Sequence, residues 1–284
     1  MNAILVPTDF SKNADKALKY AIRLTQLMKC RLILFHGFQM TAYTLDPAKS
    51  EEQREEIIKK ESEKCLKELQ KQVVAAYHSL DIQKIPSTTK LLVEFTPFIV
   101  EKIIEEARKY SIKLIVMGTH GASGLKKLFF GSTTSIMISK SEIPVLAIPE
   151  NYRYREIEKM AYASDFENMG VELEQVIPFA KGVGAHIDVV HLDYGLDSSG
   201  AQEKLATVII KKHAYKKISL ITQKAVLDYP LLKQLREYLD RGKPQWLIMF
   251  TRERGFWNKI LLGSRTEDMA NSLQVPLLSF KKGN

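Results

Sequence analysis

Glycines and hydroxyl residues are concentrated in one stretch, GTHGASGLKKLFFGSTT, which covers residues 118–134. Two residues separate Gly118 from Gly121, and nine more lead to Gly131 and Ser132. Glycine lets a backbone N–H approach a ligand closely and lets the chain turn where a Cβ would clash. Backbone N–H groups at the start of a helix, together with a serine hydroxyl, can bind an anion such as a phosphate. The spacing therefore predicts a phosphate site, with a tightly packed turn as the alternative.

Asp9 lies directly after the first apolar run of the chain, ILVPT. A carboxylate is unfavourable beside a phosphate but accepts hydrogen bonds from ribose hydroxyls. Asp9 and the stretch 118–132 together predict a nucleotide, with its sugar toward Asp9 and its phosphates toward the glycines. A capping role at the start of the following helix, shared with Ser11, is the alternative for Asp9, and helix capping is an equal alternative for Ser132.

The elements that must position these residues follow from hydrophobic periodicity. Short apolar runs at 2–8, 31–38, 90–95, 113–118 and 144–149 alternate with amphipathic stretches that begin near residues 11, 47, 97 and 131. Alternating strands and helices, with strands that are almost continuously apolar, predict a parallel sheet covered on both faces. The fold class is therefore α/β and doubly wound. Ligands of such sheets bind beyond the carboxyl ends of the strands, where Asp9, Gly118 and Gly131 are expected to meet.

The whole pattern occurs twice. ILVPTDFS recurs as MAYASDFE, KLIVMGTHGASGLKKLFFGSTT as QWLIMFTRERGFWNKILLGSRT, and IPVLAIP as VPLLSF. A period of this length indicates a duplicated domain rather than a solenoid. Two domains are therefore expected, at residues 1–150 and 151–284.

The second copy differs from the first at the glycines. It keeps Gly263 and Ser264 but has Phe250 and Glu253 in place of the first two glycines of the stretch. A phenyl ring would fill the space that phosphates need, and a carboxylate would repel them. The second half is therefore not expected to bind ATP in the same way.

Composition excludes several classes of protein. The net charge is +9, but basic residues are interleaved with acidic ones, as in EEQREEIIKKESEKCLKELQKQ, so a nucleic-acid partner is not expected. The two cysteines, Cys30 and Cys65, have no spacing typical of a zinc site or of a disulfide framework. No apolar run is long enough to span a membrane, and no secretory leader is recognised, so the expected location is the cytoplasm and no membrane partner is expected.

The motif G-x-x-G, nine residues, G-[ST], with PTDFS near the start and IPVL near the end of the first half, resembles the universal stress protein family. Because both halves carry these features, the chain resembles a tandem member. The resemblance implies a five-stranded, mainly parallel, Rossmann-like domain in each half and ATP as the cofactor, with magnesium as its accompanying ion. It implies ribose contact from Asp9, adenine contact at Gly37, and phosphate contacts from Gly118, Gly121, Gly131, Ser132 and Thr133.

The function implied by this resemblance is a stress-response protein that binds an adenine nucleotide, ATP or else AMP or ADP, in its first half. The second half would act as a pseudo-dimer partner within the chain, and a homodimer of whole chains is a further assembly. No general base or P-loop lysine accompanies the glycines, so catalysis is not the expected activity. A slow ATPase or nucleotidyl transferase and a nucleotide-free scaffold are the alternatives. Glu94, Phe95 and Thr96 replace a usual glycine turn, and Phe95, near the expected base pocket, bears on which nucleotide is preferred.

Overall fold

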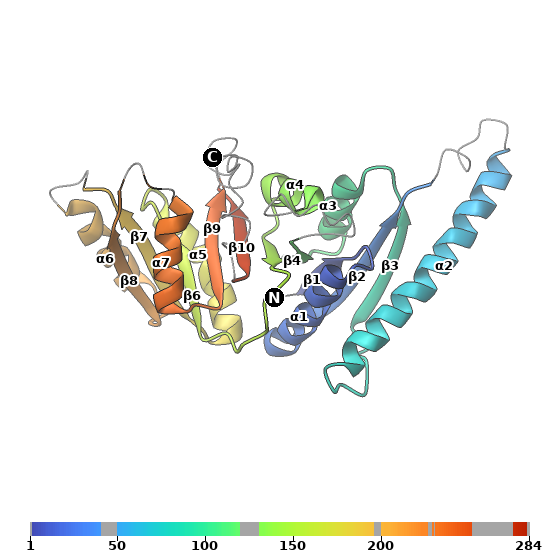
Figure 1. The fold of residues 1–284 in the computed structure, drawn as a ribbon, viewed down its shortest axis with the longest axis horizontal. Helices are drawn as coiled ribbons and strands as arrows, with labels where there is room; N and C mark the ends of the chain where they lie inside the picture. Colours follow the sequence, from blue (N-terminus) through green and yellow to red (C-terminus); the bar gives the residue numbers. More distant parts are fainter. Residues whose placement is uncertain are drawn as a thin grey trace. The chain divides into compact units, whose positions relative to one another are not determined.

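The computed structural model describes residues 2–40, 50–119, 131–195, 200–226, 229, 231–251 and 275–282. These residues belong to two compact units, of which the first ends at Glu150 and the second begins at Asn151. Figure 1 shows the helices and strands of each unit.

The first unit is built on a parallel sheet with the strand order β3-β2-β1-β4-β5. β1 lies at its centre, so Leu5 pairs with Ile33 on one side and with Ile115 on the other. Residues 3–6 of β1 are completely buried, as expected for a strand with helices on both faces of its sheet. The strands are β1 (Ala3–Pro7), β2 (Arg31–Phe38), β3 (Thr89–Phe95), β4 (Leu114–Gly118) and β5 (Val145–Ile148).

Helices cover this sheet, and two of them begin at side-chain caps. The helices are α1 (Lys12–Met28), α2 (Glu51–His78), α3 (Ile99–Lys109) and α4 (Ser132–Lys140). Ser11 Oγ accepts the N–H of Ala14 at 3.2 Å and so caps α1, while Ser50 and Gln53 form a reciprocal capping box at the start of α2. α1 packs against β4 and α2, and α3 packs against β2 and α4. The cap at Ser11 therefore fixes where the chain turns from the end of β1 into α1.

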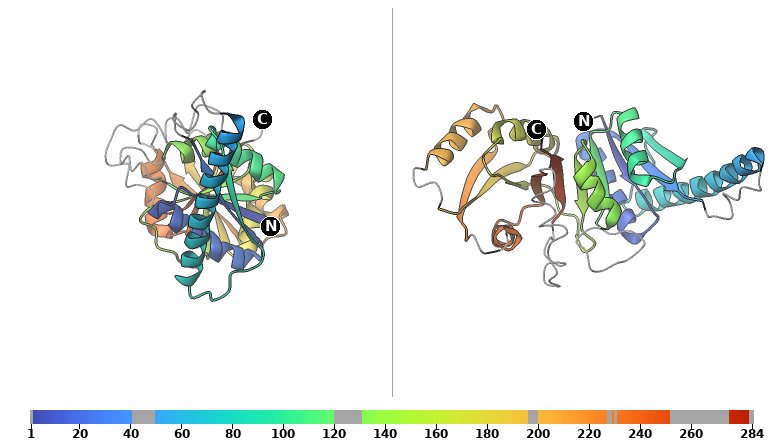
Figure 2. Two further views of the ribbon diagram at one scale, coloured as in Figure 1. Left: turned by 90° about the vertical axis from the view of Figure 1, so that its right-hand side faces the viewer. Right: turned by 90° about the horizontal axis from the view of Figure 1, so that it is seen from above.

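The second unit repeats this topology with the strand order β10-β9-β6-β7-β8, again parallel. Figure 2 shows α5 and α6 on one face of its sheet and α7 on the other. The doubly wound α/β fold expected for each half is confirmed. The elements are β6 (Lys159–Ala163), α5 (Met169–Val183), β7 (His186–Asp193), α6 (Ala201–Lys212), β8 (Ile218–Lys224), α7 (Leu231–Gly242), β9 (Trp246–Thr251) and β10 (Leu277–Lys281).

Some helix boundaries differ from the sequence expectation. α3 was expected to begin at Pro97, but it begins at Ile99 with Phe98 as its N-cap. The reason is a turn in which Thr96 Oγ1 accepts the N–H of Phe98 at 3.1 Å, which keeps these residues out of the helix.

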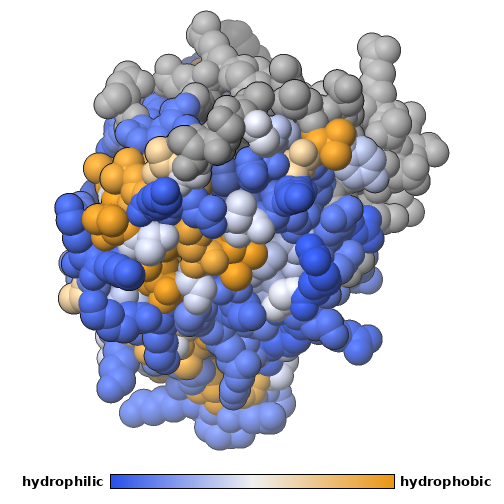
Figure 3. All heavy atoms as spheres, turned by 90° about the vertical axis from the view of Figure 1, so that its left-hand side faces the viewer, coloured by the Kyte–Doolittle hydropathy of each residue, from blue (hydrophilic) through white to orange (hydrophobic). Residues whose placement is uncertain are grey.

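The outer face of the second unit that carries α6 and the edge strand β8 mixes charged side chains with apolar patches (Figure 3). On α6, Leu205 and Val208 are 60% and 47% exposed, whereas Ala206 is buried. α6 therefore contributes little to the core of its unit, in contrast to α1, which buries residues along its whole length.

Composition had also raised questions about cysteines and membranes. Cys65 is buried and Cys30 half-buried, both are free thiols, and burial raises the pKa of each. Among the helices that the structure describes, none has the length and apolar character needed to cross a membrane.

Candidate functional site

The turn after β1 holds Asp9 at the carboxyl edge of the first sheet. Thr8 Oγ1 accepts the N–H of Phe10 at 3.1 Å, and Asp9 Oδ1 accepts the N–H of Ser11 at 3.0 Å. The Asp9 side chain is nevertheless exposed. The carboxylate thus supports the turn that leads into α1 while facing solvent, so the structural alternative for Asp9 is compatible with a ligand contact.

Gly118 ends β4 and lies against the first turn of α1. A Cβ at this position would meet backbone atoms of Asn13, its oxygen at 2.8 Å and its carbonyl carbon at 2.9 Å. Both distances are shorter than real Cβ contacts, and backbone atoms cannot rotate away. Gly118 is therefore required by the packing of α1 on the sheet, whatever else its backbone contacts.

Gly131 and the residues after it form the beginning of α4. Gly131 is the N-cap, and its N–H donates to the carbonyl oxygen of Thr119, which joins the start of α4 to the end of β4. Ser132 is the first helical residue and is exposed, and Thr133 is half-buried. Helix capping by the Ser132 hydroxyl was therefore a wrong alternative, because Gly131 occupies the cap and no described side chain makes a capping hydrogen bond there.

Thr134 was not recognised from the sequence, although it secures this arrangement. Its Oγ1 donates to the carbonyl oxygen of Gly118 at 2.9 Å, and Thr134 is 4% exposed. The second copy of the motif, GSRT, also has a threonine three residues after its glycine. That retained threonine was the signal that could have identified a structural hydroxyl.

The residues predicted to converge come from neighbouring strands. β1 and β4 are adjacent in the sheet and run in the same direction, so Asp9 and Gly118 follow or end neighbouring strands at one edge. The bonds from Gly131 and Thr134 bring the start of α4 to that same edge (Figure 1). The residues brought to this edge are Asp9, Gly118, Gly131, Ser132 and Thr133, whereas Gly121 lies outside the described residues.

Gly37 lies near the end of β2, next to β1, and side chains surround it closely. A Cβ there would lie 2.3 Å from Ile99 Cδ1 and 3.1 Å from Thr96 Cγ2, but Ile99 Cδ1 is the end of a flexible side chain that can move, unlike the backbone atoms that face Gly118. Close by, the rings of Phe38 and Phe95 pack with their centroids 5.8 Å apart. Gly37 therefore belongs to the predicted edge, and Phe95 is engaged in packing against Phe38.

Two further residues of α1 reach this edge. Asn13 is 7% exposed, and within the described part of the chain its side-chain oxygen has no hydrogen-bond partner. Lys16 is exposed, and its Nζ donates to the backbone oxygen of Glu150, just beyond β5. Neither residue belongs to a motif that the sequence reveals. A reversal of charge between the halves was the available signal, because MAYASDFENMGVE places Glu172 where the first half has Lys16.

The turn after the first strand recurs in the second unit. Asp165 Oδ1 accepts the N–H of Glu167 at 3.1 Å, and Ser164 Oγ accepts that of Phe166 at 3.1 Å. Phe166 has a φ of 69°, and its counterpart Phe10 has 61°, both in the left-handed region. Because this turn is formed in both units, it is a property of the fold and is not by itself a sign of ligand binding.

Aromatic side chains fill the corresponding edge of the second unit. Phe250, which stands where the first unit has Gly118, stacks on Phe280 with a centroid separation of 4.8 Å and an interplanar angle of 12°. The same ring packs edge-on against Tyr162 at 5.7 Å. These rings lie near the carboxyl ends of β9 and β10, and Phe280 also packs against Phe179 of α5, so side chains of the second unit itself fill this side of its sheet.

Charged groups complete this filling. Tyr162 donates a hydrogen bond to Glu172, and burial raises the pKa of both side chains. Lys282 Nζ lies 3.4 Å from a carboxylate oxygen of Glu172 and 3.1 Å from one of Asp165. The carboxylate that corresponds to Asp9 is thus already paired with a lysine of its own unit.

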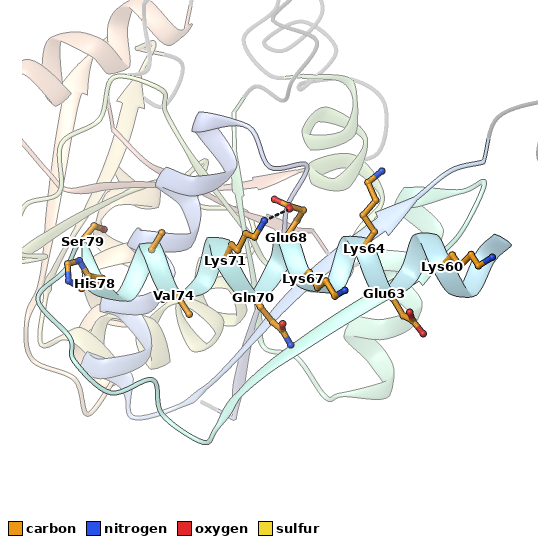
Figure 4. Close-up of a pocket in the computed structure, with 11 residues that line it drawn as sticks. Lys60, Glu63, Lys64, Lys67, Glu68, Gln70, Lys71, Val74, His78 and Ser79 are labelled. Carbon is orange, nitrogen blue, oxygen red and sulfur yellow. Dashed lines mark hydrogen bonds and ion pairs between the residues drawn. The ribbon is translucent and has the colours of Figure 1, made fainter. Parts of the chain in front are cut away.

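A surface hollow of about 870 Å³ lies along α2 (Figure 4). All of its lining residues lie between positions 60 and 79, and they include ion pairs such as Lys71 with Glu68 at 2.8 Å. Exposed pairs along one helix are typical of a solvated helix face. Within the described ranges, no cluster of three or more histidine, cysteine or acidic side chains is placed to hold a metal ion.

Comparison with known proteins identifies similar sequences and a similar fold. The sequence matches the model of the Universal stress protein family over residues 1–149. Two proteins of Methanocaldococcus jannaschii are similar in sequence to this chain. The universal stress protein MJ0531 is 27% identical to it over 149 residues, and the match covers 51% of this chain and 80% of that protein. The universal stress protein MJ0577 is 28% identical over 156 residues, and the match covers 51% of this chain and 93% of that protein. The crystal structure of a universal stress protein from Archaeoglobus fulgidus has a TM-score of 0.67 at 20% identity and covers 99% of both chains, which is a likeness of fold.

Proposed function

Because this chain belongs to the universal stress protein family, we propose that its first unit binds an adenine nucleotide. ATP is the primary candidate, and ADP and AMP are the alternatives. The observation that carries the proposal is the gathering of the β4 end and the α4 start beside the exposed carboxylate of Asp9. The ribose would contact Asp9, the adenine would lie toward Gly37, and the phosphates would lie toward Gly118, Gly131 and Ser132.

The chemistry of the α4 start supports the phosphate end of this arrangement. The first N–H groups of a helix have no partner within the helix, and the helix dipole places partial positive charge there. Ser132 adds an exposed hydroxyl at the first helical position. Gly121 and Thr133 complete the proposed contacts. A magnesium ion would be held by the phosphates of the bound ATP rather than by a dedicated group of protein side chains.

We propose a different role for the second unit. Phe250 and Phe280 stack near the carboxyl ends of its strands β9 and β10, and Lys282 forms an ion pair with Asp165. A nucleotide would have to displace both the ring pair and the ion pair. The second unit would therefore act as a partner of the first, in a pseudo-dimer within the chain or in a homodimer of chains, and the whole protein would serve a cytoplasmic stress response as a nucleotide-responsive regulator.

The test is ligand release and titration, with a matched control in the repeated turn. Small molecules released from the freshly purified protein would be identified by mass spectrometry, and ATP would be titrated into the ligand-free protein by calorimetry. Asp9→Asn keeps the oxygen that accepts the Ser11 N–H but removes the charge, so ATP binding should weaken by about tenfold or more. Asp165→Asn makes the same change in the second unit and should leave the affinity unchanged.

Two results would contradict the proposal. Absence of any nucleotide binding by the wild-type protein would favour the scaffold, and equal affinity of the wild-type protein and Asp9→Asn would remove Asp9 from the site. Phosphate release should be followed in the same samples, since steady turnover that Asp9→Asn reduces would favour the slow ATPase instead.

A further inference from the structure

The first turns of α1 place two polar side chains at the edge where the phosphates are proposed to lie. Asn13 and Lys16 are three residues apart, so they project from neighbouring positions on one face of the helix. The backbone and Cβ of Asn13 lie against Gly118 at the end of β4, and Lys16 reaches the backbone oxygen of Glu150 beyond β5. Both side chains therefore lie along the ends of the two strands that flank the glycine stretch.

Asn13 carries an unsatisfied polar atom. The residue is 7% exposed, and its Oδ1 has no hydrogen-bond partner among the residues that the structure describes. Leaving a buried polar atom unpaired is unfavourable by about 1–3 kcal/mol, so such atoms in native proteins call for an explanation. The oxygen and nitrogen of an asparagine amide exchange places when the group rotates by half a turn. Asn13 can therefore donate to a phosphate oxygen or accept from a hydroxyl without changing its packing.

Lys16 brings a positive charge to the ends of β4 and β5. It is exposed, and its described contact is to a neutral carbonyl oxygen of Glu150 rather than to a carboxylate. An ammonium group that is not neutralised by a carboxylate remains available to a phosphate. The next lysine of the helix differs, because Lys19 forms an ion pair with Asp15 at 2.9 Å.

The second unit supports this reading by its reversed charges. Glu172 stands at the position of Lys16, and Lys282 stands at the position of Glu150 in the aligned segments IPVLAIPE and VPLLSFKK. There the two side chains pair with each other at 3.4 Å inside the filled edge. In the unit whose edge is filled, the glutamate is thus paired with a lysine of its own unit, whereas the unit with the proposed site presents a lysine at that position.

We propose that α1 supplies a second set of phosphate contacts, in which Lys16 binds the terminal phosphates by charge and Asn13 binds through its side-chain amide. This inference rests on the proposed function. It places the phosphates between the N-terminal ends of α1 and α4. It also predicts that the affinity of the protein for an adenine nucleotide rises with the number of phosphates, because Lys16 contacts the terminal ones. Release of Lys16 from the carbonyl oxygen of Glu150 accompanies binding.

The experiment compares ATP, AMP, adenosine and inorganic tripolyphosphate by calorimetry on the full chain. Lys16→Met should weaken ATP and tripolyphosphate binding by about tenfold, weaken AMP binding less, and leave adenosine binding unchanged, because only the phosphates contact the ammonium. Lys19→Met, the control on the same helix, should leave all four affinities unchanged. Asn13→Ala should weaken ATP binding more than adenosine binding, and circular dichroism would establish that each variant is folded.

The outcomes separate this inference from the proposed function. Equal weakening of ATP and adenosine by Lys16→Met would show a merely structural role for Lys16 and overturn the inference, as would unchanged ATP affinity. If the wild-type protein bound tripolyphosphate through Lys16 but showed no affinity for adenosine or ATP, the phosphate contacts would stand and the nucleotide proposal would fall. Failure of the wild-type protein to bind either ATP or tripolyphosphate would overturn both.

Discussion

Replacing Gly118 by alanine tests whether this glycine is required by packing even when no ligand is present. The added Cβ would lie 2.8 Å from the backbone oxygen of Asn13, about 0.6 Å inside the shortest ordinary contact of 3.4 Å. Because the opposing atoms are backbone, the first turn of α1 or the end of β4 must shift. Overpacking of this kind destabilises by about 1–3 kcal/mol. For a domain of about 150 residues, that corresponds to a decrease in Tm of about 2–12 °C.

The assay can separate the two halves of the chain. Both tryptophans, Trp246 and Trp257, lie in the second half, so tryptophan fluorescence follows that half while far-UV circular dichroism follows both. In the absence of nucleotide, Gly118→Ala should lower the midpoint temperature of the unfolding transition of the first half. This transition is seen by circular dichroism but not by tryptophan fluorescence. Gly170→Ala is the matched control. Gly170 lies in helix α5, where alanine is favoured over glycine. The added Cβ would meet Ile209 of α6 at 3.8 Å, an ordinary van der Waals distance.

The refuting result is simple to state. If Gly118→Ala unfolds at the same temperature as the wild-type protein, the contact with Asn13 is not a constraint on the fold. The glycine at position 118 would then have to be explained by ligand binding alone, and the ATP affinity of this variant would be the next measurement.

Thr134→Val should destabilise the first unit by about 1–3 kcal/mol in urea denaturation, because it leaves the partly buried carbonyl oxygen of Gly118 without the hydroxyl donor. Thr207→Val removes a similar bond on the exposed surface of α6 and should change stability by less than about 0.5 kcal/mol; equal effects of the two changes would contradict this. Burial raises the pKa of Glu172 above its ordinary 4.5, so its contribution to stability is fully present below the unfolded value and is lost as the pH rises through the folded one. In fluorescence-detected urea unfolding, the difference between the wild-type protein and Glu172→Gln should follow that pH dependence, and a difference independent of pH would refute it.

Local patterns accounted for most of what the sequence predicted. Ser11 was expected as a helix cap and is one, because capping depends on a few adjacent residues. The doubly wound fold followed from the alternation of apolar strands with amphipathic helices. The edge at which Asp9 and Gly118 lie followed from the topology of such sheets, since parallel strands present their carboxyl ends together.

The remaining features depend on contacts between distant residues. The bond from Lys16 to Glu150 joins positions 134 residues apart, which no periodicity encodes. The reason for Gly118 is the approach of α1 to β4, and this approach is set by the packing of the whole helix. Ser132 was a candidate for the N-cap of α4, but Gly131 is the N-cap. A sequence alone does not show which of two adjacent residues is the last one outside the helical conformation. The role of Gly121 stays a prediction.

The reversed charges of the two units also affect how the chain reaches its native fold. Two halves with one topology can exchange strands during folding, a characteristic misassembly of repeated domains. If the last strand of the second half were placed beside β4, Lys282 would approach Lys16. The opposite exchange would bring Glu150 toward Glu172. Since like charges raise the free energy of both exchanged arrangements, the pattern favours assembly of each sheet from its own strands over exchange between the halves.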